Sequence, residues 1–242
     1  MLLDKYNATI DELLAKVRTT QRENIIKAGE MIAEAAGRGA CVHIHDTGHI
    51  IDSELIFRGG GLIMYKKLKY SLTVDNPVRK RDRADIDTSM AGLAAYALKA
   101  SGARPGDVII LGSVSGRNLP VVDLALEAKK FGMTLIAITS MTYSPQVPSD
   151  HPCGKRLFEL ADLVIDNCAP AAEAMMEIEG LPARFAAASG IAAATIMWSV
   201  SAVVVETMMQ KGLLPGVLKS ANFPGGNEFN QEVIRHYEEF GY

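Results

Sequence analysis

The stretch from Gly106 to Ser140 constrains the fold of this chain more than any other part of its sequence. It begins with the apolar run 108–111, which is rich in β-branched residues and typical of a strand buried on both faces. Apolar residues then recur at helical spacing over 119–131, and after a glycine the range 133–139 is a second apolar run. A strand, a helix and a strand in this order predict a parallel βαβ unit, which is right-handed in nearly all proteins.

A short polar turn joins the first of these strands to the helix, and it is the first candidate for a ligand site. Such a turn lies at the carboxyl edge of a parallel sheet and at a helix N-terminus, where backbone N–H groups are unpaired and the helix dipole is positive. Ser113, Ser115 and Asn118 add side-chain donors in this turn. The sequence therefore predicts an anion site here, and phosphate is an anion that suits it.

The rest of the chain indicates a three-layer α/β/α sandwich around a five-stranded parallel sheet. Apolar runs predict strands at 40–46, 62–66, 108–111, 133–139 and 163–165. Periodicity and helix-ending glycines predict helices within 1–38 and at 50–58, 85–101, 119–131, 155–161, 185–210 and 228–240.

We expect one domain over residues 1–242. It consists of an N-terminal helical segment (1–38), a sheet core (40–166) and C-terminal helices (183–242). The pattern over 167–182 fits neither a strand nor a helix clearly, so the sequence makes no prediction there.

Composition excludes several classes of protein. The chain is 48% hydrophobic and 22% charged, which indicates a large core rather than disorder. The net charge of −3 and pI of about 6.0 offer no electrostatic basis for binding nucleic acid. Three widely separated cysteines, Cys41, Cys153 and Cys168, argue against a disulfide framework and suit a reducing cytosol.

Two segments bear on membranes and targeting. The N-terminus lacks a charged region followed by an apolar one, so we expect no signal peptide and a cytoplasmic protein. The apolar stretch from Phe185 to Met209 contains several small polar residues and Glu206. We interpret it as a buried core or interface helix rather than a membrane span.

The turn and its flanks resemble the sugar isomerase (SIS) domain family. Residues 113–118 read SVSGRN, with Gly106-Asp107 before them and Ala128-Lys129, Gly132 and Ile138-Thr139-Ser140 after them. The resemblance continues in 54–61 (ELIFRGGG), 154–157, 162–167 (DLVIDN) and 220–230 (SANFPGGNEFN). The chain is similar to uncharacterised bacterial SIS-domain proteins related to the phosphoheptose isomerases.

The resemblance implies a sheet order and a ligand. In the strand order 2-1-3-4-5 of the family, the turn after the first strand, Thr47-Gly48-His49, lies beside the serine-containing turn. In the family that turn holds the phosphate of a phosphosugar. The resemblance therefore implies binding by the residues Thr47, Gly48, Ser113, Ser115, Gly116, Asn118, Thr139 and Ser189.

Glu54 and Arg58 are the candidates for the chemical step. They are four residues apart, so on a helix both face the same way. In the phosphoheptose isomerases a Glu and an Arg at this spacing act as general base and as a group that holds substrate or interface. Aldose–ketose isomerisation moves a proton between neighbouring carbons, which a carboxylate shielded from water can do. The alternative is an ordinary surface ion pair.

The histidines allow a metal site or a proton shuttle. His43 and His45 lie two apart on the predicted first strand, but such residues are more often core histidines with one hydrogen bond. His49, in the first turn, is the candidate for a proton shuttle or a hydroxyl-binding group, and His151 is a weaker one. We expect neither a metal nor a cofactor, although Asp46 and His49 leave the metal question open.

The first turn departs from the family pattern in two places. Ile50 replaces a serine that contributes to ligand binding in the family, and Asp46 places a carboxylate near the expected phosphate. These changes point to an altered substrate or to lost activity. Near the C-terminus, Asn222, Asn227, Glu228 and Asn230 either cap a helix or belong to a loop that closes over a site, including one on a neighbouring subunit.

The leading hypothesis is a cytosolic phosphosugar isomerase. By resemblance it forms a homodimer or homotetramer with sites near the subunit interface. A non-catalytic sugar-phosphate sensor or regulatory protein is the alternative, and a phosphosugar lyase or etherase is a third, because the same fold carries all of these functions.

Overall fold

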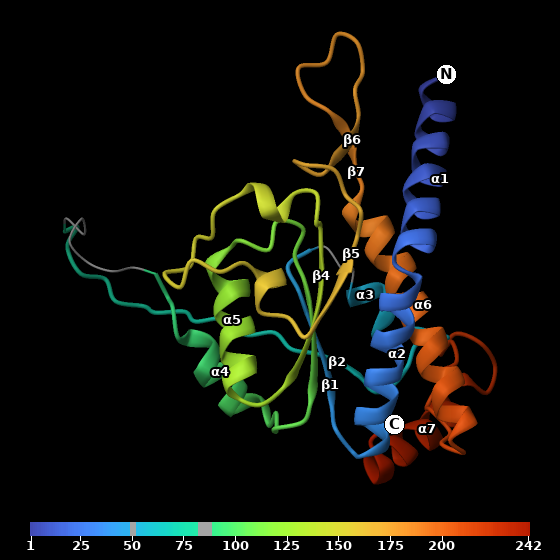
Figure 1. Ribbon diagram of the computed structural model, residues 1–242. Coiled ribbons are helices and arrows are strands. Elements are labelled where there is room, and N and C mark those ends of the chain that lie inside the picture. Colours follow the sequence, from blue (N-terminus) through green and yellow to red (C-terminus); the bar gives the residue numbers. More distant parts are fainter. Residues whose placement is uncertain (49–51, 82–88) are drawn as a thin grey trace.

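The computed structural model describes residues 1–48, 52–81 and 89–242, and these form a sheet with helices on both faces (Figure 1). The sheet has five strands in the order β2-β1-β3-β4-β5, and every neighbouring pair is parallel. Its strands are β1 (Val42–Asp46), β2 (Tyr65–Lys67), β3 (Val108–Gly112), β4 (Thr134–Thr139) and β5 (Leu163–Asp166). The predicted three-layer α/β/α architecture and strand order are confirmed.

Alternate residues of the strands face two separate hydrophobic cores. On β3, Ile110 belongs to the larger core, while Ile109 and Leu111 belong to the smaller one. The larger core is covered by α1 (Leu2–Thr20), α2 (Arg22–Gly37) and α6 (Ser189–Gln210), and the smaller one by α4 (Leu93–Ser101) and α5 (Leu119–Lys130) (Figure 1). The remaining helices are α3 (Asp52–Leu55) and α7 (Gly226–Phe240).

Helix α6 is long and apolar enough to cross a membrane by length and composition, as no other described helix is. It packs along α2, where a Cβ added at Gly29 would lie 2.5 Å from the Cβ of Val203, so a side chain at Gly29 would separate the helices. Its fully buried residues include Ala192, Ala193, Ile196, Val204 and Met208. The contact with α2 and the sheet thus accounts for the apolar residues on the buried face of α6.

A β-hairpin occupies part of the range for which the sequence makes no prediction. It pairs β6 (Ala174–Met176) with β7 (Phe185–Ala187) in antiparallel register and projects beyond the sheet (Figure 1). The prediction of a helix from residue 185 is therefore wrong at its start, because 185–187 pair with β6 and α6 begins at Ser189. Three-residue strands are too short to show the alternation that identifies a strand.

Several other predicted boundaries shift. Of the helix expected at 50–58, residues 50 and 51 lie outside the described residues, and α3 ends at Leu55, two residues before Phe57 turns the chain away with a φ of 55°. The second strand begins at Tyr65 rather than at residue 62, and 155–161 contains only a 3₁₀ turn, Leu157–Glu159. The helix expected from residue 85 is described only as α4, since 82–88 lie outside the described residues.

Tyr65 is a large buried side chain that carries a hydroxyl group into the core. Its phenol oxygen lies 3.1 Å from Oγ of Ser201, whose own hydroxyl donates to the carbonyl of Met197 at 2.7 Å, so the phenol is the donor. Burial raises the pKa of Tyr65 to about 12, and the hydrogen bond with Ser201 opposes this only in part. The folded protein therefore keeps this phenol neutral at pH values at which an unfolded tyrosine ionises.

The raised pKa of Tyr65 predicts a loss of stability at alkaline pH. The contribution of Tyr65 to the free energy of unfolding is fully present below pH 10. It is lost as the pH rises from 10 towards 12, because in that range only the unfolded chain releases the phenol proton. Tyr65→Phe should lower the free energy of unfolding by about 1 kcal/mol at neutral pH, since the hydrogen bond is lost. The difference in free energy of unfolding between wild type and Tyr65→Phe, measured by urea titration, should then narrow above pH 10. Tyr96→Phe, on an exposed ring, is the control, and an unchanged difference would contradict the prediction.

Candidate functional site

The polar turn 113–118, here called the serine turn, joins β3 to α5 and is held to the end of β4. The carbonyl of Val114 accepts hydrogen bonds from the hydroxyl of Thr139 and from the N–H of Ser140, each at 3.0 Å. The N–H of Ser113 donates to the carbonyl of Ile138 at 3.1 Å. Thr139 is fully buried, so its hydroxyl shapes the turn from below rather than lining its outer surface.

Gly116 is the position at which the serine turn admits no side chain. Its φ is 59°, and an added Cβ would lie 3.1 Å from Cβ of Leu157, 3.1 Å from Oγ of Ser144 and 3.2 Å from Oγ1 of Thr139. Its N–H donates to Oγ of Ser113 at 3.3 Å, and its carbonyl accepts from the N–H of Leu157 at 2.8 Å. The turn is thereby closed against the loop 141–157.

The outer side of the serine turn presents unused donors. Within the described residues, the backbone N–H groups of Ser115, Arg117 and Asn118 have no acceptor. Asn118 is the N-cap residue of α5 and its side chain makes no capping hydrogen bond. With α5 behind them, these groups form the kind of helix N-terminus that binds anions.

Two further polar groups at this turn were not predicted. Nε of Arg117 and Oγ of Ser144 are buried and have no hydrogen-bond partner among the described residues. Most buried polar groups in proteins are paired, so unpaired ones indicate a place for a polar ligand or water. Arg117 also forms an ion pair with Asp150, whose N–H donates to the Arg117 carbonyl at 3.0 Å. The signal in the sequence was an arginine inside a serine-rich turn.

The turn after β1 reaches the same edge of the sheet. The hydroxyl of Thr47 donates to the carbonyl of Gly112 at 2.9 Å, which places Thr47 beside the end of β3. Asp46 accepts the N–H of Gly48 at 2.8 Å and that of Asp52 at 3.3 Å, so its carboxylate is used within its own turn. His49 and Ile50 lie outside the described residues.

Glu54 and Arg58 form an ion pair with an N–O distance of 2.5 Å, and their side chains are 36% and 50% exposed. Glu54 also lines an open hollow of about 690 Å³ between α1 and α6, together with Arg18, Thr195 and Trp198. No hydrogen bond or ion pair among the described residues joins Glu54 to the serine turn. Glu54 is thus engaged by Arg58 and lies beside α6.

Ser189 lies at the start of α6 and is almost fully buried. Its hydroxyl donates to the carboxylate of Glu173, which precedes the hairpin and has a φ of 73°. This hydrogen bond ties the start of α6 to the residue before the hairpin.

Both histidines of β1 have hydrogen-bond partners, and His43 is also buried. Nε2 of His43 lies 3.0 Å from Oδ2 of Asp107, and Nδ1 of His45 lies 2.9 Å from the carbonyl of Leu68. In the part of the chain that the structure describes, no group of three or more His, Cys, Asp or Glu side chains is placed to hold a metal ion.

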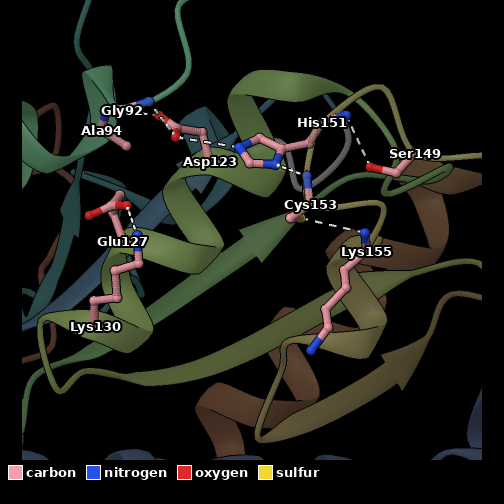
Figure 2. A network of polar contacts seen from close by, with 9 residues as sticks. All are labelled: Gly92, Ala94, Asp123, Glu127, Lys130, Ser149, His151, Cys153 and Lys155. Atoms are coloured by element: carbon pink, nitrogen blue, oxygen red, sulfur yellow. Dashed lines mark hydrogen bonds and ion pairs between the residues drawn. The ribbon is translucent and has the colours of Figure 1, made fainter.

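Figure 2 shows how His151 is engaged. Its Nδ1 accepts the N–H of Cys153 at 3.1 Å, and its Nε2 lies 3.7 Å from Oδ1 of Asp123 on α5. Asp123 is buried and accepts the N–H groups of Gly92 at 2.7 Å and Ala94 at 3.0 Å, which begin α4. His151 therefore ties its loop to α5, and Asp123 ties α5 to α4.

Tyr70 lies between this network and β1. Its ring stacks on that of His45 with centroids 5.7 Å apart. Burial, and to a lesser degree the charge of Asp123, raise the pKa of Tyr70 to about 12. The phenol is therefore neutral near pH 7 and cannot serve as a base there.

Replacing Gly116 tests whether the shape of the serine turn depends on it. Gly116→Ala should lower the free energy of unfolding by about 2–3 kcal/mol, because it adds both a strained φ and contacts near 3.1 Å. Gly106→Ala is the matched control: φ is 92° there, but a Cβ meets nothing within 4 Å, so only the backbone cost of about 1 kcal/mol applies. Equal losses in urea denaturation would contradict the role of the contacts.

Comparison with known proteins bears on the family of this chain. The family model of the SIS domain matches residues 5–140. A UPF0309 protein of Streptomyces coelicolor is 32% identical over 235 residues, covering 96% of this chain and 93% of the relative. A UPF0309 protein of Geobacillus kaustophilus is 32% identical over 243 residues, covering 98% and 95%.

Solved structures share the fold at low sequence identity. A phosphoheptose isomerase from Francisella tularensis matches with a TM-score of 0.51 and 14% identity, covering 86% of this chain and 96% of that one. Phosphoheptose isomerase from Neisseria gonorrhoeae matches with a TM-score of 0.50 and 14% identity, covering 86% and 100%. At this identity the likeness bears on the fold alone.

Proposed function

This chain belongs to the SIS domain family, and on that premise we propose that it binds a phosphosugar at the serine turn and interconverts its aldose and ketose forms. The observation that carries the proposal is the set of unused N–H groups of Ser115, Arg117 and Asn118 at the start of α5. A phosphate is the sugar substituent that such a set of donors binds.

The phosphate interacts with three kinds of donor. Ser113 accepts the N–H of Gly116, which leaves its own hydroxyl proton for the ligand, and Ser115 and Asn118 add a hydroxyl and an amide. The guanidinium of Arg117, with its unpaired Nε, supplies positive charge at the side of the turn. Gly48 and Thr47, across the sheet edge, approach the sugar.

Glu54 is the proposed base. It removes the proton from the carbon next to the carbonyl and returns it to the former carbonyl carbon, while the hydroxyl proton moves between the two oxygens. His49 is the proposed carrier of that second proton, and Arg58 orients the substrate.

Assembly brings the two parts of the site together in this proposal. Glu54 faces an open hollow on α1 and α6 that is lined by apolar groups such as Ile191 and Trp198. A second copy of the chain covers this face in a homodimer or homotetramer and completes the site. Light scattering that gives the mass of a single chain would remove this premise. We expect the protein to act in the cytoplasm on a small molecule, with no cofactor.

Deuterium exchange tests the chemical step. In deuterated water with a panel of sugar phosphates, the protein should introduce deuterium at C1 or C2 of its substrate, and Glu54→Gln should slow this by about 100-fold or more. The measurement is proton NMR. Glu206→Gln is the matched control, because Glu206 is the one acid on α6. Loss of exchange in Glu206→Gln, with Glu54→Gln unaffected, would transfer the role of base to α6.

Binding can be tested apart from turnover. Ser115→Ala should lower the affinity for the same sugar phosphate by about 10-fold or more, because a hydrogen bond to a charged oxygen is lost. Isothermal titration measures this, with Ser101→Ala on α4 as the control. Equal affinity for wild type and Ser115→Ala would mean that the serine turn does not hold the phosphate.

A sensor or regulatory protein is the second candidate. The observation that favours it is the Glu54–Arg58 ion pair, since the carboxylate needed as a base is already engaged by a guanidinium. The first turn also carries Asp46. A sensor would bind the sugar phosphate without deuterium exchange, and Glu54→Gln would leave its affinity unchanged.

A further inference from the structure

Two stretches far apart in the sequence, 57–61 and 218–223, meet beside the edge strand β2. The N–H of Gly60 donates to the carbonyl of Leu218 at 2.7 Å, and the N–H of Leu218 donates to the carbonyl of Gly61 at 3.0 Å. They enclose a hollow of about 560 Å³ that continues into a neighbouring one of about 500 Å³. We call the two together the lateral hollow. Its main side chains are Phe57, Arg58, Lys219, Ser220, Asn222 and Phe223.

The rim of the lateral hollow is held in place by close contacts. A Cβ added at Gly59 would lie 2.9 Å from the backbone N of Ser220, and one at Gly226 would lie 2.1 Å from the carbonyl oxygen of Ser220. The amide of Asn230 accepts the N–H of Lys219 at 2.8 Å and donates to its carbonyl at 2.9 Å. The backbone of Lys219 and Ser220 is thus fixed from three sides, as a binding site requires.

The charge of the lateral hollow is positive. Lys219 and Arg58 line it, and no acidic residue does so in the described chain. The ammonium of Lys219 lies 3.9 Å from the ring centroid of Phe229 and has no carboxylate within 4.0 Å among the described residues. Arg58 forms an ion pair with the carboxylate of Glu54. The hollow therefore favours an anion.

Two exposed aromatic rings accompany these cations. Phe57 is 74% exposed and Phe223 is 73% exposed, although both belong to segments with a fixed backbone. Phe57 has a φ of 55°, a conformation that costs a residue other than glycine about 1 kcal/mol or more. Exposed aromatic faces stack on planar rings, nucleobases in particular.

We infer that the lateral hollow binds a nucleotide, with its phosphate on Lys219 and Arg58 and its base against Phe223. Ser220 and Asn222 supply hydrogen-bonding groups for the sugar or the base edge. A free anion would need only the cations, and an apolar compound only the rings. A nucleotide uses both. This site shares Arg58 with the site proposed above, but the inference rests on the residues of the lateral hollow and not on phosphosugar binding at the serine turn.

Titration of the full chain with the four common nucleoside monophosphates, with the matching nucleosides and with inorganic phosphate tests the inference. At least one monophosphate should bind 10-fold or more tightly than its nucleoside and than phosphate. Lys219→Gln and Phe223→Ala should each weaken it by about 10-fold or more. Lys99→Gln and Tyr96→Ala are the matched controls, because Lys99 and Tyr96 are also a lysine beside an exposed aromatic ring. Nζ of Lys99 lies 5.8 Å from the ring centroid of Tyr96.

Ser115→Ala separates this inference from the proposed function. This variant should leave the affinity for the nucleotide unchanged, while it lowers the affinity for the sugar phosphate. Nucleotide affinity that is lost in Ser115→Ala, or that survives both Lys219→Gln and Phe223→Ala, would overturn the inference. So would phosphate binding as tight as the monophosphates. If no monophosphate binds and the two variants instead change the molecular mass in solution, the hollow is a contact between copies and the inference is wrong.

Discussion

Burial of β3 on both faces is the constraint on which the rest of the structure depends. Its five residues are all buried, and β3 pairs in parallel with β1 on one side and β4 on the other. Parallel pairing brings the carboxyl ends of these strands to one edge, so that the turns after β1 and β3 meet there. Two contacts follow from this register. Thr47 bonds to the end of β3, and Thr139 bonds to the serine turn.

The fold could be predicted from the sequence where burial and local pattern agree. β3, α5 and β4 were predicted within a residue of their bounds because the apolar run, the helical spacing and the stop at Gly132 all indicate the same unit. The hairpin of β6 and β7 was not, because its strands have three residues each and include residues with positive φ nearby, such as Glu173. α3 was overestimated because the left-handed φ of Phe57 leaves no trace in residue type.

The site divides in the same way. The serine turn was predictable because small residues between a strand and a helix are a local signal. The buried, unpaired polar atoms of Arg117 and Ser144 could not be predicted, since their burial depends on the loop 141–157, which folds back over the turn. Local spacing correctly paired Glu54 with Arg58, but only the packing of α3 near α6 shows that this carboxylate lines a hollow beside α6.

Arg58 has a position that joins two parts of the molecule. Its guanidinium binds the carboxylate of Glu54, and the same side chain lines the lateral hollow. An anion that draws Arg58 into that hollow leaves the carboxylate of Glu54 without its counter-charge. If the lateral hollow binds an anion in this way, its occupancy changes the free energy with which a second ligand binds beside Glu54. Thermodynamic linkage then requires the effect to be reciprocal: whatever factor the first ligand applies to the affinity of the second, the second applies to the first.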